Sequence, residues 1–301
     1  MQSQTAVLQQ SLQSDGIGYA QGRFVALDEP VIPIDDRAHQ FGDGIYEVVR
    51  VYHGKPFLVD YHLERFERSA KALRLPLERA IEDLRALIFE AIARSAFSES
   101  QVYFQLSRGI VKRDHAFPTV PSHLSLTVRP VQDEKYHTMR QSGQMMMTAE
   151  DIRWKYCYIK SLNLLANVMA KQTALDAGVN DAIFVRQGVV TEGTSSNLAI
   201  VSKGEMITHP ADEYILHGVT RRAVLEIAQE NGISVREEHF SVEALLAADE
   251  VFTMSSLTEI APVVQVDGRS VGLVALQENS VVRLLQSAYK NRILRETSWN
   301  G

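Results

Sequence analysis

The sequence predicts an α/β (α+β) protein of two domains, and three observations support this fold class. Short runs with strand character alternate with longer runs whose apolar residues recur three or four positions apart. The length of 301 residues is sufficient for two domains. Near residues 131–144 the sequence turns polar and loses its periodicity, as expected where one domain ends. We therefore expect a flexible tail (1–16), a small α/β domain (17–135) and a larger domain (136–301).

The expected first domain has strands on either side of two helices. Residues 46–52 consist mainly of strand formers and end at a His53-Gly54 turn, so they predict a strand. Residues 63–73 carry apolar side chains at positions i, i+3, i+7 and i+10, which is typical of a helix with one buried face. Residues 77–96 repeat that pattern. The other strands expected in this domain are residues 17–27, 31–34, 102–106 and 124–128.

The expected second domain is a meander of strands with three helices. A helix over residues 161–177 ends at Gly178, because glycine is the usual residue just beyond a helix C-terminus. A helix over residues 219–231 ends in the same way at Gly232, and a closing helix spans residues 277–295. The strands expected here are residues 145–148, 182–185, 189–191, 197–201, 206–208 and 251–256.

Composition excludes several classes of function. The 37 acidic residues outnumber the 31 basic ones, giving a net charge of −6, which disfavours a general nucleic-acid or anionic-membrane role. Cys157 is the only cysteine, so no intrachain disulfide forms, and a reducing cytoplasm is expected. The Gln- and Ser-rich start lacks the features of a signal peptide, and no apolar run is long enough for a membrane span.

Two segments suggest a cofactor site. Lys160 follows a nearly uncharged run, residues 156–159, and burial favours the neutral amine, which is nucleophilic. Residues 190–197 place Glu192 before a turn rich in hydroxyl groups. A nucleophilic amine, an acid and a polar cradle are the groups that hold pyridoxal phosphate (PLP). The structural alternatives are a lysine that extends from a strand end into solvent and a solvated acid in a turn.

Three motifs carry a resemblance to a known family. They are Glu-Asp-Ile-Arg-Trp at residues 150–154, Ile-Lys-Ser-Leu-Asn-Leu-Leu at residues 159–165 and Thr-Glu-Gly at residues 191–193. The chain resembles the fold-type IV PLP enzymes, which include D-amino-acid transaminases, branched-chain aminotransferases and aminodeoxychorismate lyases. The likeness is greatest to the bacterial D-amino-acid transaminases and runs from about Ile17 to the last helix. It implies the two-domain fold of that family.

The resemblance assigns roles to the cofactor residues. Lys160 would form the Schiff base with PLP and move the proton between the substrate Cα and the cofactor C4′ carbon. Glu192 would keep the pyridine nitrogen protonated. The start of the helix at residue 219, preceded by Gly218, is a potential phosphate site, with Thr220 as a possible N-cap. The residues that the resemblance places around the cofactor are Arg65, Ser195, Ser196, Leu216, Val219, Thr220, Ser255 and Ser256.

The resemblance also implies a site for the substrate. Arg113 would bind the α-carboxylate, and His115 and Tyr46 would add hydrogen bonds. Fixing the carboxylate on one side of the lysine selects which Cα–H bond faces it, so geometry would select the D-enantiomer. In the family the arginine and the histidine come from the second subunit, which implies a homodimer with a shared active site.

The function expected from the sequence is transamination of D-amino acids of the D-alanine type, with a 2-oxo acid such as 2-oxoglutarate as acceptor. The alternatives are a branched-chain L-amino-acid or (R)-amine transaminase, an aminodeoxychorismate lyase, and a PLP-binding protein without activity. Three positions depart from the family pattern: Ser256 and Leu257 replace common threonines, and His217 replaces a lysine. No phosphate-binding glycine motif occurs, and the nine histidines show no metal-ligand spacing, so no metal site is expected.

Overall fold

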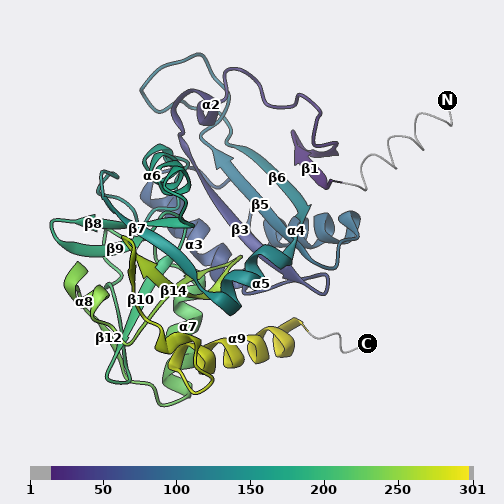
Figure 1. Ribbon diagram of the computed structural model, residues 1–301. Helices are drawn as coiled ribbons and strands as arrows, with labels where there is room; N and C mark the ends of the chain where they lie inside the picture. The colour runs from purple at the N-terminus through teal and green to yellow at the C-terminus, as the bar shows by residue number, and fades with distance from the viewer. Residues whose placement is uncertain (1–14, 298–301) are drawn as a thin grey trace. The chain divides into compact units, whose positions relative to one another are not determined.

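The computed structural model describes residues 15–297, which form two compact units (Figure 1). The first unit takes the described residues up to Val131, Ile159–Asn163 and the residues from Arg295 on; the second takes Gln132–Tyr158 and Leu164–Leu294. The predicted α/β class is confirmed, because each unit combines a sheet with helices. The chain is not divided by one cut near residue 135, since the segment that carries Lys160 belongs to the first unit. The predicted tail lies outside the described residues, except for Asp15 and Gly16.

The first unit is built on a six-stranded antiparallel sheet. Its order is β2 (Arg23–Val25), β1 (Ile17–Ala20), β6 (His123–Pro130), β5 (Ser100–Ser107), β3 (Gly44–Tyr52) and β4 (Lys55–Pro56). The predicted His53-Gly54 turn joins β3 to β4, and both residues have the positive φ that a two-residue hairpin needs. Because β4 pairs only with Val51 and Tyr52, it leaves the beginning of β3 without a strand on that side.

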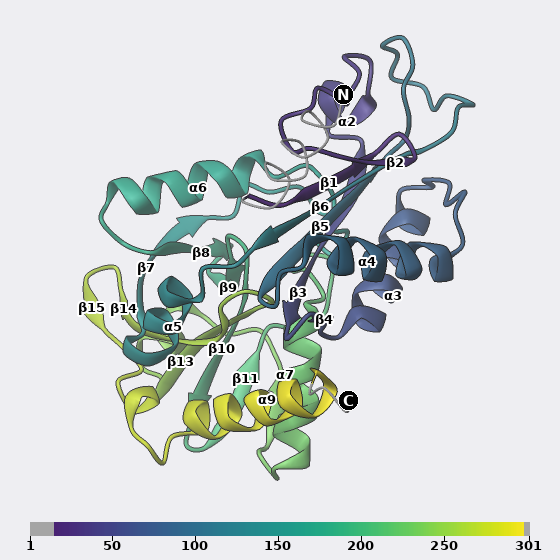
Figure 2. The same ribbon diagram turned by 90° about the vertical axis from the view of Figure 1, so that its right-hand side faces the viewer.

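Two helices, α3 (Val59–Ala72) and α4 (Ile81–Ser95), lie along one face of this sheet (Figure 2). The predicted apolar stripe of α3 is confirmed, since Leu63, Phe66 and Ala70 are buried. The ring of Phe66 packs 5.1 Å from that of Phe104 on β5. These contacts fix α3, and therefore Arg65, against the sheet.

One strand predicted for this unit is absent, and another is two strands in the structure. Residues 31–34 form no strand: Pro33 lacks an N–H, and Ile32 and Ile34 are 49% and 79% exposed. Residues 17–27 form two strands, β1 and β2, instead of one. After the irregular stretch the short helix α2 (Arg37–Phe41) begins, with the Asp36 side chain accepting the Ala38 N–H at its N-cap.

The second unit contains a nine-stranded mixed sheet. Its order is β12 (Val235–Glu237), β11 (Glu205–Thr208), β10 (Asn197–Ser202), β13 (Glu250–Ser255), β14 (Glu259–Val266), β7 (Gln144–Glu150), β8 (Asp181–Arg186) and β9 (Val189–Gly193), with β15 (Arg269–Ser270) beside β14. β11–β12, β14–β7 and β7–β8 are parallel. Apolar side chains from β7 through β14 share one core, including Met146, Ile183, Val190, Leu198 and Val251. β9, which carries Glu192, is part of this core.

The helices of this unit are α5 (Asp133–Ser142), α6 (Leu165–Asp176), α7 (Val219–Glu230), α8 (Val242–Leu246), the 3-10 turn η1 (Val274–Leu276) and α9 (Val281–Thr297), whose residues from Arg295 on are assigned to the first unit. α6 runs along β7 and β8 (Figure 2). The polar stretch near residue 135 contains α5, which has no buried residue and therefore no apolar stripe. α6 begins at Leu165 and not at Ser161, and it ends before Gly178, whose φ is +77°. None of the helices within residues 15–297 is both long and apolar enough to cross a membrane.

The N-termini of two helices are stabilised in different ways. α9 begins later than predicted, because the carboxylate of Glu250 accepts the N–H groups of Val281 and Val282 at 2.9 and 2.8 Å. α7 has Gly218 as its N-cap and no side-chain cap, so the prediction that Thr220 is the N-cap was wrong; Thr220 lies inside the first turn. The backbone donors at the start of α7 therefore lack a capping side chain.

Candidate active site

Lys160 is held against the edge of β3 by its own backbone. Its carbonyl accepts the N–H of Tyr46 at 3.0 Å, and the Leu162 N–H donates to Gly44 at 3.0 Å. Ser161 consequently forms an antiparallel bridge with Ile45. The segment occupies the part of the β3 edge that β4 leaves uncovered. It is thus a short strand-like addition to the first sheet and not the start of a helix.

The side chain of Lys160 is half-buried and lies over an aromatic ring. Its Nζ is 4.3 Å from the centroid of Tyr46, a cation–π distance. The Lys160 N–H donates to Ser69 Oγ on α3 at 3.2 Å. Among the described residues of the first unit, no carboxylate forms an ion pair with this amine. The amine is therefore held in place without a bound acid that would block it.

The nearby carboxylate of Glu47 is fully engaged by other groups. Arg65 donates to it twice, at 2.8 and 2.7 Å, and His62 Nδ1 lies 2.7 Å from Oε2. Burial opposes the charged form of Glu47, but the charge and hydrogen bonds of Arg65 outweigh it and lower its pKa to about 2. The same burial lowers the pKa of His62, with Glu47 opposing. Glu47 thus fixes the orientation of Arg65, which lies one turn before Ser69 on α3.

In the second unit, Glu192 lies on β9 with only 5% of its surface exposed. Arg153 Nη1 donates to Oε1 at 2.5 Å, and Asn197 Nδ2 donates to Oε2 at 2.9 Å. The Leu216 N–H is shared between both oxygens, at 3.1 and 3.0 Å. Glu192 is therefore a buried acceptor with three donors and a fixed orientation.

Arg153 is itself shared between two acids. Asp151 accepts from its Nε and Nη2, both at 2.8 Å, while Glu192 receives a single bond. Burial raises the pKa of Glu192 above its usual value; Arg153 offsets this in part, and Asp151 adds to it. The opposing charges raise the pKa of Arg153 despite its burial. Glu192 is thus an acid with an increased tendency to hold a proton.

The loop from residue 209 to 218 connects Glu192 with the start of α7. Leu216 contributes its N–H to Glu192, and its carbonyl accepts from Asn197 at 2.8 Å. A Cβ on Gly218 would lie 1.9 Å from Asn197 Oδ1, so only glycine fits there. Val219 and Thr220 are buried in the first turn of α7. The predicted phosphate-binding segment is therefore an uncapped helix N-terminus fixed through Asn197.

The four predicted serines differ in their surroundings. Ser255 Oγ lies 2.7 Å from Thr258 Oγ1 and also accepts the Thr258 N–H at 3.2 Å. Ser256, at the end of β13, is half-buried, as is Ser196, whereas Ser195 is exposed. The backbone of this turn is fixed, because Ser196 O accepts the Gly193 N–H at 2.7 Å. These positions remain predictions for cofactor contacts.

The predicted carboxylate-binding residues form two groups within the first unit. Arg113 and His115 are exposed and pack on Phe41, with the Arg113 guanidinium carbon and the His115 ring 4.7 and 5.4 Å from its ring centroid. Tyr46 stacks on Tyr103 at 5.6 Å, and burial raises the pKa of Tyr103 to about 12. Among the described residues of this unit, no hydrogen bond, ion pair or ring contact joins Arg113 or His115 to Tyr46 or Lys160.

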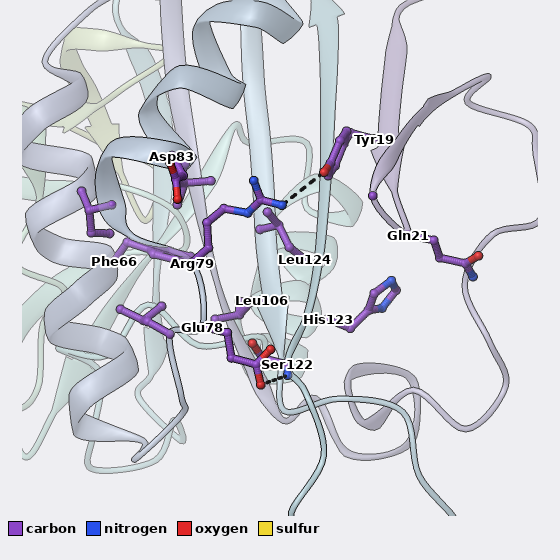
Figure 3. A pocket seen from close by; sticks show the side chains of 14 residues that line it. Tyr19, Gln21, Phe66, Glu78, Arg79, Asp83, Leu106, Ser122, His123 and Leu124 are labelled. Atoms are coloured by element: carbon purple, nitrogen blue, oxygen red, sulfur yellow. Dashed lines mark hydrogen bonds between the residues drawn. The ribbon is translucent and has the colours of Figure 1, made fainter.

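A cavity of about 480 Å³ in the first unit contains none of the predicted site residues. Two of its charged groups bond to other residues of its wall (Figure 3): Arg79 Nη2 reaches Tyr19 Oη at 3.4 Å, and Glu78 accepts the Ser122 N–H at 3.3 Å. The cavity lies between β1, β6 and the start of α4. Its lining therefore does not match the predicted chemistry.

Two residues with a direct contact to Glu192 were missing from the predicted site. Arg153 lies within the Glu-Asp-Ile-Arg-Trp motif, and Asn197 closes the segment that begins at residue 190. Both residues lie in segments that the sequence singles out, but spacing alone does not show that the fold brings Arg153, 39 positions away, onto Glu192. A search for a basic partner of every acid in the shared motifs would have found Arg153.

The donor set fits PLP. The cofactor needs an amine for its aldehyde, an acid for its ring nitrogen and aligned donors for its phosphate. The structure provides an amine without an ion pair in its own unit, a buried acid with a raised pKa and an uncapped helix N-terminus. Lys160, Glu192 and the first turn of α7 are the residues that would hold these three parts.

Comparison with known proteins identifies the family of the chain. The sequence model of the family "Amino-transferase class IV" matches residues 44–266. A D-alanine aminotransferase of Bacillus licheniformis is 38% identical over 278 residues, which cover 92% of this chain and 97% of that protein. A D-alanine aminotransferase of Staphylococcus epidermidis is 39% identical over 282 residues, covering 91% of this chain and 97% of that protein.

Solved structures show the same fold. The branched-chain amino acid aminotransferase of Escherichia coli superposes with a TM-score of 0.86 at 26% identity, covering 95% of this chain and 98% of that one. A T.th. branched-chain amino acid aminotransferase, complexed with N-(5'-phosphopyridoxyl)-L-glutamate, gives a TM-score of 0.84 at 25% identity and covers 95% of this chain and 97% of that one. The family match and the D-alanine aminotransferase relatives show that the chain belongs to the class IV aminotransferases.

Proposed function

We propose that the protein is a PLP-dependent aminotransferase that acts on D-amino acids of the D-alanine type and passes the amino group to a 2-oxo acid such as 2-oxoglutarate. The observation that carries this proposal is the 38–39% identity to D-alanine aminotransferases of two bacterial genera across nine-tenths of the chain. A cytoplasmic location is part of the proposal and is supported by the single cysteine, Cys157, which is buried and free.

When bound, PLP joins covalently to an amine and withdraws electrons from the carbon that carries it. Lys160 would provide the amine that holds the cofactor aldehyde and, once released, would move the proton between the substrate Cα and the cofactor C4′ carbon. Glu192 would accept the hydrogen of the protonated ring nitrogen, a role supported by the three donors that fix its carboxylate. Arg153 and Asn197 are positioning residues that keep the carboxylate aimed.

The phosphate group would be bound by the first turn of α7 together with Arg65. α7 offers backbone donors and the positive end of a twelve-residue helix dipole. Arg65 adds a planar guanidinium whose orientation Glu47 fixes. Ser255, Ser256 and the Ser195-Ser196 turn add hydroxyl and backbone donors, and the Leu216 side chain would pack on the cofactor ring.

A homodimer completes the proposed active site. Arg113 and His115 are exposed and make no contact with Tyr46 in their own described unit, so a second copy of the chain would bring them to the substrate carboxylate. The second unit exposes large apolar side chains that a partner could cover: Ile152, Tyr156, Leu165, Val168 and Met169 are 52–72% exposed. Exposed apolar side chains of this size support the proposal of a protein–protein interface on this unit.

The second candidate is a branched-chain L-amino-acid aminotransferase. The two branched-chain enzymes described above favour it through TM-scores of 0.86 and 0.84. Both are only 25–26% identical to this chain, well below the D-alanine aminotransferases. A shared fold does not decide the substrate, which depends on the residues around the carboxylate and side chain. An (R)-amine transaminase or a lyase on this scaffold has no such observation in its favour.

Two measurements test the proposal. The purified holoenzyme should form pyruvate from D-alanine and 2-oxoglutarate at least 10-fold faster than it consumes L-leucine, a modest discrimination of about 1.4 kcal/mol. Arg113→Ala should lower kcat/KM for D-alanine by about 30-fold, since a charged hydrogen bond contributes about 2 kcal/mol. Lys112→Ala, which removes the neighbouring charge, is the control.

The two variants also distinguish the alternatives. Activity with (R)-phenylethylamine, which has no carboxylate, should change little in Arg113→Ala. An equal loss with D-alanine and with the amine would exclude Arg113 as the carboxylate ligand. Faster turnover of L-leucine than of D-alanine by the wild-type enzyme would assign the protein to the branched-chain alternative.

A further inference from the structure

Three side chains outside the proposed active site converge at the end of two paired strands. His209 directly follows β11, and His239 lies two residues after β12. β11 and β12 run parallel, with Thr208 opposite Glu237, so the segments that follow the two strands leave the sheet at the same edge. The two imidazole rings consequently lie 4.5 Å apart, and the loop after His209 places Asp212 beside both.

The three side chains present one ligand atom each to a common point. Nε2 of His209 and Nε2 of His239 lie 3.1 and 3.2 Å from the same carboxylate oxygen, Asp212 Oδ2. All three atoms lie within 4.8 Å of one another. A tetrahedral zinc site with bonds of about 2.0–2.1 Å separates its ligand atoms by roughly 3.3 Å. Two of the three separations lie close to that edge length, and the third is no more than 4.8 Å.

The hydrogen bonds around the cluster fix two of these ligands in the required form. His209 Nδ1 lies 2.9 Å from the Val190 carbonyl, and a carbonyl only accepts, so Nδ1 carries the hydrogen. In the neutral ring, Nε2 then directs a lone pair at a carboxylate oxygen, which also has only lone pairs to offer. The second carboxylate oxygen, Oδ1, accepts the Tyr214 N–H at 2.8 Å. A cation between the three atoms would satisfy all of them, and a backbone carbonyl behind a ligand histidine is the usual arrangement.

We propose that His209, Asp212 and His239 bind a divalent cation of the zinc class. Two imidazoles and one carboxylate suit Zn²⁺, and the 55% exposure of the His239 side chain leaves the fourth position open to water. The sequence spacing gave no sign of this site, because the strand pairing of β11 with β12, and not the chain order, brings position 239 beside position 209.

A cation at this site would stabilise the loop of residues 212–216, whose Leu216 N–H donates to Glu192. Asp212 begins the segment in which the Tyr214 carbonyl accepts from Arg153 at 3.1 Å and the Leu216 N–H donates to Glu192. A cation that fixes Asp212 to two strands would therefore stiffen residues 212–216. This effect does not depend on which amino acid the enzyme uses.

The direct test is a titration of the chelator-treated, tag-free holoenzyme with Zn²⁺ alone, followed by calorimetry and by elemental analysis after desalting. We expect one zinc per chain. His239→Ala and Asp212→Asn should each weaken zinc binding by about 100-fold. Loss of a residue that only hydrogen-bonds to a metal ligand already costs up to about 100-fold in affinity. His239 is exposed, so its replacement should leave the fold intact, as circular dichroism would show.

His53→Ala is the matched control, because His53 also faces a carboxylate, Glu99 at 3.9 Å, as an exposed pair. It should bind zinc like the wild type. Co²⁺ in place of Zn²⁺ should give tetrahedral visible absorption bands that His239→Ala abolishes. Zinc retained equally by wild type and His239→Ala, or no zinc retained by the wild type, would overturn the proposal and leave a hydrogen-bonded cluster in which His209 is protonated.

Discussion

Two buried glutamate–arginine pairs, one in each unit, behave in opposite ways. Glu47 in the first unit has its pKa lowered to about 2, whereas the pKa of Glu192 in the second unit is raised. Both carboxylates are almost fully buried, with 0% and 5% of their surfaces exposed. Burial alone therefore does not explain the difference.

The difference lies in how many guanidinium hydrogen bonds each carboxylate receives. Glu47 receives two bonds from Arg65 and a third from His62. Glu192 receives one bond from Arg153, which gives two to Asp151. A buried carboxylate is stabilised as an ion when it has a guanidinium to itself, and much less when it shares one with a second acid. The first arrangement suits a structural support, and the second a more basic carboxylate that can accept a hydrogen bond from a ring nitrogen.

The largest effect should come from removing the amine that the first unit contributes. Lys160→Ala should lower D-alanine turnover by at least about 10³-fold, because the covalent link and the proton transfer are both lost. Lys155→Ala, an exposed lysine paired with Glu213 at 3.4 Å, is the control and should remain within about twofold of wild type. Borohydride reduction of the holoenzyme should label Lys160, and a label on another lysine would contradict the assignment.

The next effect concerns stability and compares the two arginines. Arg153→Met leaves two buried acids, Asp151 and Glu192, without their cation, and should cost about 3–5 kcal/mol. Arg65→Met removes both guanidinium bonds from Glu47, which keeps its hydrogen bond to His62, so it should cost less. Urea unfolding of the apoprotein measures both free energies. A smaller loss of unfolding free energy in Arg153→Met than in Arg65→Met would contradict the proposal that Arg153 serves two buried acids and Arg65 one.

The pH dependence should follow from the lowered pKa of Glu47. A group with a depressed folded pKa stabilises the protein above its unfolded pKa, and this contribution disappears as the pH falls through the folded value. The wild-type protein should therefore lose about 3 kcal/mol between roughly pH 4.5 and 2 through Glu47. In Glu47→Gln the unfolding free energy should lack this dependence on pH below about pH 4.5. The same decrease in the variant as in the wild type would show that Glu47 is not held in its ionised form.

The smallest effect should come from Asn197→Ala. This change removes one donor from Glu192 and another from the Leu216 carbonyl and should cost about 1–2 kcal/mol. It should also lower kcat more than it raises KM for D-alanine, because the aim of Glu192 is loosened while the carboxylate-binding residues remain. A change confined to stability, with normal kcat, would make Asn197 purely structural.

Much of the fold could be predicted because local signals agreed with it. The stripe of Leu63, Phe66 and Ala70 predicted α3, and the glycines at residues 178 and 232 marked two helix ends. β14 was not predicted, because Pro262 lies within it and proline argues against a strand. Residues 31–34 were predicted as a strand because they are rich in apolar side chains, but in the structure they lie in a loop where Ile32 and Ile34 are exposed. These errors arise where tertiary context overrides local pattern.

The candidate site divides in the same way. Lys160 and Glu192 could be singled out because they stand in long motifs. What sequence could not reveal is that the Lys160 segment adds to the edge of β3, or that Arg153 is shared between Asp151 and Glu192. Both facts depend on strand register between segments far apart in the chain, and the His209–His239 pair depends on it too.

The most direct test of the comparison is a ¹³C NMR titration of side-chain-labelled glutamates in the apoprotein, with Glu47→Gln and Glu192→Gln providing the assignments. We expect the Glu192 signal to titrate above the usual glutamate pKa of about 4.3 and the Glu47 signal to remain ionised well below it. A Glu192 that stays ionised as far into the acid range as Glu47 would contradict the account.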